Sequence, residues 1–288
     1  MGQAFVPGEL RGYFNDLAAK TRWSGKCDQQ GIPLVKLADR RTACFATTIA
    51  QKALGHWDRC QLHGAPLDRD EFLKIAGWLL ARQDARGGWP VWADLGLALC
   101  SPCNAMTQGQ CISVFVRAHS TIGDPSYAEA SRRALDLMRK SVSEGGVAAI
   151  EGADVYLEEV PDDTRTSILN GWIFALFGLY DMQIGLGDPY AAELLSTSME
   201  TVRKSLADYD SAYWSYYDAR GSLASCFYHD LHIAQLKALG EVDNRCPVWE
   251  ETVDRWTGYG NCCLCRWRAS VVKTAQKLRN PGKVIVMS

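Results

Sequence analysis

Residues 123–142 read GDPSYAEASRRALDLMRKSV and residues 187–206 read GDPYAAELLSTSMETVRKSL, so one pattern occurs twice in the chain. Both copies open on Gly-Asp-Pro and close on Arg-Lys-Ser, at the same offset of 64 residues (187 − 123 and 203 − 139). Repetition at a fixed offset is typical of a supersecondary unit that is used more than once. We therefore expect two copies of one structural unit in this part of the chain.

The Gly-Asp-Pro triplet predicts where a helix begins. Asp124 and Asp188 can each cap a helix, and the proline that follows suits the first helical position because its missing N–H needs no partner there. In the first copy, apolar residues such as Tyr127 and Leu137 recur on one side of the predicted helix, while the arginines lie largely elsewhere. Such an amphipathic helix is expected on the outside of the fold.

The segments that precede these helices are apolar almost all round, which predicts enclosed helices. An enclosed helix followed by an amphipathic one occurs four times: Thr47–His56 with Asp68–Gln83, Ile112–Ile122 with the first repeat, Ile168–Leu186 with the second repeat, and His229–Leu239 with Pro247–Trp256. We predict an all-α protein, an (α/α) toroid or barrel of about four helical hairpins with little β structure. A helical solenoid has the same signature and stays an alternative.

Length and composition favour one compact domain. The chain has 288 residues, 47% of them hydrophobic, and it contains no low-complexity segment or Ser/Gly-rich linker. We expect residues 42–288 to form the barrel and residues 1–41 to pack on it as an N-terminal segment.

The charge balance argues against some partners. With 31 basic and 33 acidic residues the net charge is −2, and no basic block indicates nucleic acid as a partner. The most apolar stretch, Gly171–Tyr180, is about half of the ~20 residues that a membrane span needs. The first residues also lack the pattern of a secretory signal. We predict a cytoplasmic protein without a membrane span, and the sequence leaves a homo-oligomer open.

The cysteines indicate a reducing compartment rather than a disulfide framework, because 11 is an odd number in a chain of this size. Cys100 and Cys103 have a C-x-x-C spacing, and Cys262, Cys263 and Cys265 cluster later in the chain. The second group lacks the matching spacing, so zinc is the less favoured alternative. No acidic cluster has the spacing of a calcium loop. We expect no metal and no other cofactor.

Polar residues recur where the enclosed helices are predicted to begin. Helix N-termini present unpaired N–H groups and the positive end of the helix dipole, so a ring of them favours a carboxylate-bearing ligand. The same side chains could instead cap the helices and hydrogen-bond to one another. They are Thr47, Thr48 and Gln51; Asn104, Gln108 and Gln110; Asn170; and Tyr228, His229, His232 and Gln235.

Two further elements allow opposing interpretations. Trp89, in the segment QDARGGWPVW, could stack on a sugar ring or fill the core, since tryptophan serves both purposes. The sequence Asp162-Asp163-Thr164 is a weak candidate for the acidic cluster of a terpene cyclase, because a short acidic motif is little evidence without its structural context.

With these residues assembled, the chain resembles the D-glucuronyl C5-epimerase family, whose members convert D-glucuronate to L-iduronate within heparosan and heparan sulfate precursors. The segments AMTQGQCISVFVRA from Ala105, TSILNGWIFALFGLYD and FYHDLHIAQL carry the resemblance, with weaker support from TTIAQKALGHW and YYDAR. These segments extend from about Thr47 to Leu239. The resemblance implies an α/α-barrel catalytic domain without the family's β-rich N-terminal domains, in a minimal bacterial version.

The resemblance also implies roles for particular residues. Epimerisation at C5 removes a proton next to a carboxylate and returns one from the opposite face, so it needs two proton carriers and donors for the charged intermediate. The family's tyrosines map onto Tyr228 and Tyr217, and its arginine maps onto Arg220. Its Glu-Glu-Tyr-Pro segment maps onto residues 158–161, where Val160 replaces the tyrosine and Glu159 remains.

We therefore expect Tyr228 to be one proton carrier, Glu159 or Tyr217 to replace the lost tyrosine, and Arg220 to hold the uronate carboxylate with the helix starts. Candidate substrate-binding residues are Asn104, Gln108, Gln110, Asn170, His229, His232 and Trp89. Glu158 is expected to be a solvated charge.

Two other functions stay open for the same chain. A uronate lyase-type elimination needs only one base, and a non-catalytic glycan-binding homologue could keep the groove without turnover, because Val160 cannot exchange a proton. The partner in each case is a uronate-containing glycan, and which polysaccharide or oligosaccharide it is stays open.

Overall fold

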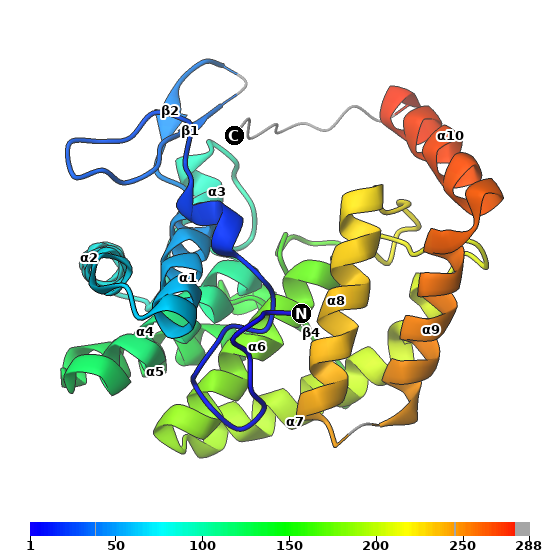
Figure 1. Ribbon diagram of the computed structural model, residues 1–288. Helices are drawn as coiled ribbons and strands as arrows, with labels where there is room; N and C mark the ends of the chain where they lie inside the picture. Colours follow the sequence, from blue (N-terminus) through cyan, green and yellow to red (C-terminus); the bar gives the residue numbers. More distant parts are fainter. Residues whose placement is uncertain (38, 245, 280–288) are drawn as a thin grey trace.

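Four helical hairpins make up most of the chain in the computed structural model, which describes residues 1–37, 39–244 and 246–279 (Figure 1). The hairpins are α1 (Ala46–His63) with α2 (Pro66–Arg82), α4 (Ala105–Ile122) with α5 (Pro125–Arg139), α6 (Leu169–Leu186) with α7 (Pro189–Ser205), and α8 (Cys226–Val242) with α9 (Pro247–Asn261). The first helix of each pair packs beside that of the next pair, in the order α1, α4, α6 and α8. The prediction of an all-α fold is confirmed.

Short elements connect the hairpins. Strands β1 (Val35–Lys36) and β2 (Thr42–Ala43) pair with each other, as do β3 (Ala148–Glu151) and β4 (Asp154–Leu157), and the described residues form no other sheet. The remaining elements are α3 (Val91–Asp94), the 3-10 turns η1 (Ala18–Thr21), η2 (Val142–Glu144) and η3 (Leu206–Tyr209), and α10 (Cys263–Arg279). Helix α10, red in Figure 1, follows α9 and projects beyond it.

The repeated Gly-Asp-Pro triplet forms the turn between an inner and an outer helix. Gly123 and Gly187 end α4 and α6 with φ of 72° and 62°, a left-handed conformation that glycine adopts without strain. Asp124 then accepts a hydrogen bond from Ser126 N–H, and Asp188 accepts from the N–H groups of Tyr190 and Ala191. The repeat therefore encodes one sharp reversal of direction, used twice.

The backbones of α4 and α6 touch where the two helices cross. A Cβ atom added at Gly178 would lie 2.2 Å from the carbonyl oxygen of Gly109, and one added at Gly109 would lie 2.6 Å from Cα of Ala175. No side chain fits between the helices at this point. These two helices are almost entirely buried, as their apolar sequences predict.

A buried ion pair fastens the N-terminal segment to the same two helices. Arg117 of α4 donates to Asp181 of α6 with an Nη1–Oδ2 distance of 2.5 Å, and both side chains are at most 1% exposed. The other guanidinium nitrogen donates to the carbonyl of Gly12, and Tyr13 N–H donates to Asp58 of α1. Strand β2 pairs back onto β1, so contacts cross the proposed division at residue 41, which stays a prediction.

Gly178→Ala tests the contact between the helices. The added methyl group has no space between two backbones, so we expect the free energy of unfolding to fall by about 1–3 kcal/mol, the usual effect of overpacking. Chemical denaturation followed by circular dichroism measures it.

Gly258→Ala in α9 is the matched control, because a Cβ atom there meets nothing within 4 Å. The better helix propensity of alanine should raise stability by up to about 1 kcal/mol. Equal effects of the two substitutions would contradict the close approach of α4 and α6.

Candidate functional site

The first turns of all four inner helices open onto one cavity of about 520 Å³. Polar side chains at these helix starts line it, and apolar walls come from Met106, Phe174 and Leu231. The polar residues are Thr47, Thr48 and Gln51 of α1, Asn170 of α6, and Tyr228 and Asp230 of α8. Four helix N-termini pointing toward one space favour a ligand with negative charge, because their unpaired N–H groups and dipoles add there.

Glu158 and Glu159 directly follow β4 and have opposite environments. The carboxylate of Glu158 is buried and accepts hydrogen bonds from the N–H and O–H groups of both Thr166 and Ser167. The expectation that Glu158 is a solvated charge was wrong, because the chain folds back over it between β4 and α6. Ser167 has a φ of 43°, which is uncommon for a residue other than glycine, and its N–H lies 3.0 Å from Oε2 of this carboxylate.

Glu159 lines the cavity and lacks such partners. Its Oε2 atom is inaccessible to solvent and has no hydrogen-bond donor, and a Cβ atom added at Gly171 in the first turn of α6 would lie 2.1 Å from it. Burial, and secondarily the charge of Glu158, raises the pKa of Glu159 to about 7. A carboxyl group with this pKa can accept and release a proton at neutral pH. Val160 next to it has no exchangeable proton.

Tyr228 faces the same cavity from α8 and contacts Tyr217. The two rings lie 4.7 Å apart between centroids at an angle of 58°. Burial and the charge of Glu159 raise the pKa of Tyr228, while the hydroxyl of Tyr217 opposes this rise. The pKa of Tyr217 lies well above its ordinary value, chiefly because of burial. Both phenols are therefore protonated at neutral pH. Tyr217 does not line the cavity itself and contacts Tyr228, which does.

Arg220 lies apart from the cavity. Its guanidinium group donates to the carbonyl oxygens of Thr164 and Arg165, 2.6 and 3.2 Å away. The side chain thus fastens the loop that leads to α6, and it lines a different pocket on the far side of Tyr217.

The two histidines of α8 are buried in a structural network. Nε2 of His229 donates to the Trp256 carbonyl, so Nδ1 is left to accept from the Ser215 hydroxyl or N–H, and the ring stacks on Trp214. Nδ1 of His232 contacts the same Ser215 hydroxyl, and its Nε2 has no partner. Burial lowers the pKa of His232 to about 3, so that imidazole is neutral. Neither residue lines the cavity.

Three other candidates have structural contacts, and a fourth, Gln110, is buried outside the cavity. The Asn104 side chain caps α4 by accepting from Thr107 N–H, and Gln108 donates to the carbonyls of Gly87 and Ala134. Trp89 is buried and donates to the Leu79 carbonyl, which leaves no face for a sugar. Both amide atoms of Gln110 are buried without partners, outside the cavity lining.

The N-terminal segment supplies cavity residues that the sequence patterns did not indicate. Asn15, Asp16 and Lys20 form one wall, and Lys20 is the only basic side chain among the described lining residues. Phe227, beside Tyr228, is 65% exposed at the rim. The N-terminal residues belong to no repeat and no α-helix, so only the tertiary fold reveals that they reach the site.

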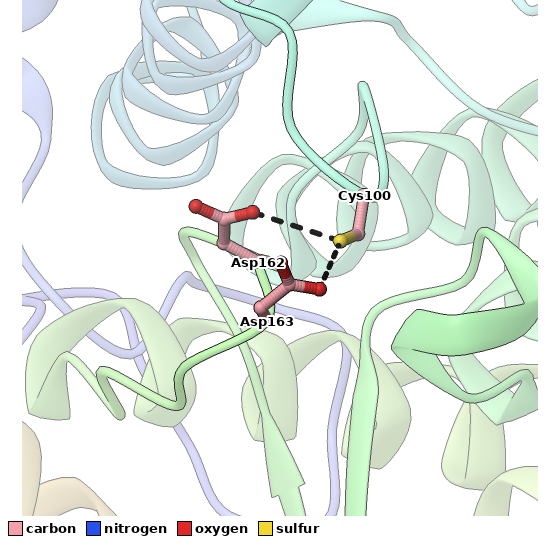
Figure 2. Close-up of side chains that lie close together, drawn as sticks. All are labelled: Cys100, Asp162 and Asp163. Atoms are coloured by element: carbon pink, nitrogen blue, oxygen red, sulfur yellow. Dashed lines mark hydrogen bonds between the residues drawn. The ribbon is translucent and has the colours of Figure 1, made fainter.

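A cysteine and two aspartates lie together on neighbouring loops (Figure 2). The Cys100 thiol donates to Asp163 at 3.2 Å and approaches Asp162 at 3.6 Å. The hydrogen bond to Asp163 is the largest cause that raises the pKa of Cys100 to about 11. This is the only group of three or more potential metal ligands in the described part of the chain, and all three are exposed. A protonated thiol shared by two carboxylates accounts for the contacts.

No helix within the described ranges is long and apolar enough to cross a membrane.

Comparison with known proteins relates this site to a family. The family model described as D-glucuronyl C5-epimerase C-terminus matches residues 83–258, more than half of the chain. The D-glucuronyl C5-epimerase of Caenorhabditis elegans is 32% identical over 213 residues, which cover 65% of this chain and 34% of that protein. An uncharacterised protein of Methanocaldococcus jannaschii is 26% identical over 136 residues, 46% of this chain and 44% of that protein.

The chain thus matches less than half the length of either relative. The matched region contains Glu159, Asn170 and Tyr228, which line the cavity, together with Tyr217. The chain belongs to the D-glucuronyl C5-epimerase family, through the C-terminal region of that family.

Proposed function

We propose that this protein is a carbohydrate epimerase that inverts C5 of a glucuronate residue within a glycan. The observation that carries the proposal is the presence of Glu159 and Tyr228 on one cavity, at the N-termini of inner helices. Family membership supports an epimerase-like reaction, and the charge of the uronate suits the helix dipoles. The substrate that we favour is a heparosan-like polymer.

In the proposed reaction, a base takes the C5 proton and the electron pair of the C–H bond moves into the uronate carboxyl group. A proton then bonds to C5 from the opposite face. Glu159 is the better base because its pKa of about 7 leaves part of it ionised at neutral pH. Tyr228 is the better acid because burial keeps its phenol protonated. Two groups whose environments separate their pKa values in this way are typical of an acid–base pair.

Tyr217 supports the acid in this scheme. After Tyr228 has donated its proton, the neighbouring hydroxyl of Tyr217 can stabilise the phenolate, since that hydroxyl acts to lower the pKa of Tyr228. Before the next turnover Glu159 releases its proton to solvent, and the Tyr228 phenolate takes up a proton from solvent. The reverse reaction exchanges the roles of the two groups, as microscopic reversibility requires.

Lys20 and the helix N-termini are our candidates for holding the uronate carboxylate. The Asn170 amide lines the same cavity, and its Oδ1 atom has no protein donor. An amide or ammonium donor placed where charge develops stabilises the intermediate.

Val160 supports a second candidate function, a glycan-binding protein without turnover. Elimination across the ring is the third outcome, because it needs only the base. Incubation with a glucuronate polymer in heavy water separates the three. We expect deuterium at C5 together with iduronate; an unsaturated uronate would indicate a lyase, and binding without either product would indicate a binder.

Tyr228→Phe removes the proposed acid. We expect formation of iduronate to fall by about 100-fold or more, the usual contribution of a general acid. Tyr190→Phe is the control, because Tyr190 is 53% exposed on α7, away from the cavity. Full activity of the Tyr228 variant would remove this residue from the mechanism.

Glu159→Gln and Glu158→Gln should change stability in opposite directions. The pKa of Glu159 is raised from 4.5 to about 7 in the folded protein, so the buried carboxylate destabilises the fold as the pH rises through this range. At about pH 8 the free energy of unfolding of the Glu159 variant should be about 2 kcal/mol higher than that of the wild type. At about pH 4.5 this difference should disappear. Denaturant titrations at the two pH values measure it.

The Glu158 variant should instead lose about 1–3 kcal/mol at about pH 8, because an amide cannot accept from all the donors that surround this carboxylate. A gain in stability for both variants would show that we have misassigned the environments of the two glutamates.

Gly171→Ala tests whether the position of Glu159 matters. The new methyl group would collide with the carboxylate, and a displacement of about 1 Å can reduce turnover by about 100-fold. Gly77→Ala in α2 is the control, since its nearest neighbour would be the Tyr127 hydroxyl at 3.8 Å. Unchanged kcat in the Gly171 variant would argue against Glu159 as the base.

A further inference from the structure

A second, basic pocket lies beside the tyrosine pair. It has a volume of about 210 Å³ and is formed by the turn at residues 220–222 and by Lys273, Gln276 and Lys277 of α10. Its charged lining residues are Arg220, Lys273 and Lys277, and no acidic residue lines it. The pocket is therefore electropositive in a chain whose net charge is −2.

The three positive charges have no ion-pair partner among the described residues. Arg220 donates only to neutral carbonyl groups. The nearby carboxylate of Asp218 accepts from the backbone N–H groups of Arg220 and Ser222, which form the turn. Burial is the main cause that lowers the pKa of Lys273; the charge of Asp218 opposes this, and the smaller effect of Lys277 adds to it. Three positive charges beside the single carboxylate of Asp218 leave a net positive charge in the pocket, which a bound anion would balance.

The wall of the pocket is held in place by hydrogen bonds. Gln276 of α10 accepts from Leu223 N–H at 2.9 Å and donates to the Gly221 carbonyl at 3.2 Å. The helix and the turn therefore form one unit, and the basic side chains project from a fixed frame.

One aromatic ring separates this pocket from the candidate site. Nζ of Lys273 lies 5.8 Å from the ring centroid of Tyr217, whose other neighbour is the ring of Tyr228 in the cavity. The cavity itself is poor in positive charge, since Asp16, Glu159 and Asp230 line it with Lys20 alone. Long-range attraction of an acidic glycan must therefore come from outside the cavity.

We propose that the pocket formed by Arg220, Lys273 and Lys277 binds a second acidic sugar of the glycan whose glucuronate occupies the cavity. The proposal rests on the proposed function and adds to it a binding site for the polymer outside the cavity. Helix α10 begins after residue 258, where the family match ends, so Lys273 and Lys277 come from a segment outside that match.

The test compares short and long oligosaccharides from a glucuronate–N-acetylglucosamine polymer. The double variant Lys273→Gln/Lys277→Gln should bind an octasaccharide about tenfold more weakly than the wild type in isothermal titration calorimetry, as the loss of charge-assisted contacts predicts. Binding of a disaccharide should stay within about twofold. Arg279→Gln is the matched control, because it removes a positive charge from the exposed end of the same helix outside the pocket.

The outcomes decide between the alternatives. A length-dependent loss in the double variant, with little change in Arg279→Gln, supports the second subsite whether or not the protein turns the glycan over. Equal losses of octasaccharide affinity in the double variant and in Arg279→Gln would show that only overall charge matters, and would overturn the proposal. Weakened binding of inorganic sulfate without any effect on the octasaccharide would also overturn it, as would unchanged octasaccharide binding.

Discussion

The buried carboxylate of Glu158 is the contact on which the candidate site depends. The four groups that donate hydrogen bonds to its carboxylate oxygens are the N–H and O–H groups of Thr166 and Ser167, shortly before α6. Its backbone carbonyl accepts from Ala105 N–H at the start of α4, and its N–H donates to Val147 beside the β3–β4 hairpin. One residue thus joins the beginnings of two inner helices to the hairpin between them. Because a buried charge is stable only when donors surround it, the loop from β4 to α6 has little freedom.

Because Glu158 is fixed in this way, the side chain of the next residue, Glu159, faces the cavity. The Trp92 indole N–H donates to its backbone carbonyl, and Gly171 leaves room for its carboxylate. Two adjacent glutamates of identical chemistry therefore have different roles. One is fully hydrogen-bonded and holds the fold, and the other lacks partners and keeps a pKa suited to proton transfer. In the proposed reaction this second glutamate takes a larger part, because Val160 stands where the resemblance to the family places a tyrosine.

The cavity and the neighbouring basic pocket carry charges of opposite sign. The cavity offers helix N-termini and one lysine against three carboxylates, which suits a reaction that stores negative charge briefly. The basic pocket beside Tyr217 offers three cations against the one nearby carboxylate of Asp218, which suits attraction and retention of an acidic polymer. The arginine that the sequence assigned to the reacting carboxylate lies in the basic pocket. Its side chain cannot reach the cavity while it holds the carbonyl groups of Thr164 and Arg165.

The sequence by itself determined the helical hairpins, because apolar periodicity and the Gly-Asp-Pro turn act through local backbone geometry. It also indicated that polar residues gather at the inner helix starts, and Thr47, Asn170 and Tyr228 do line one cavity. It could not tell which polar residues face a ligand, since the hydrogen bonds of Gln108 and His229 depend on partners that are distant in the chain. Only the tertiary structure decided that Lys20 and α10 stand beside the site, because neither belongs to a repeat and contact between remote segments leaves no local pattern.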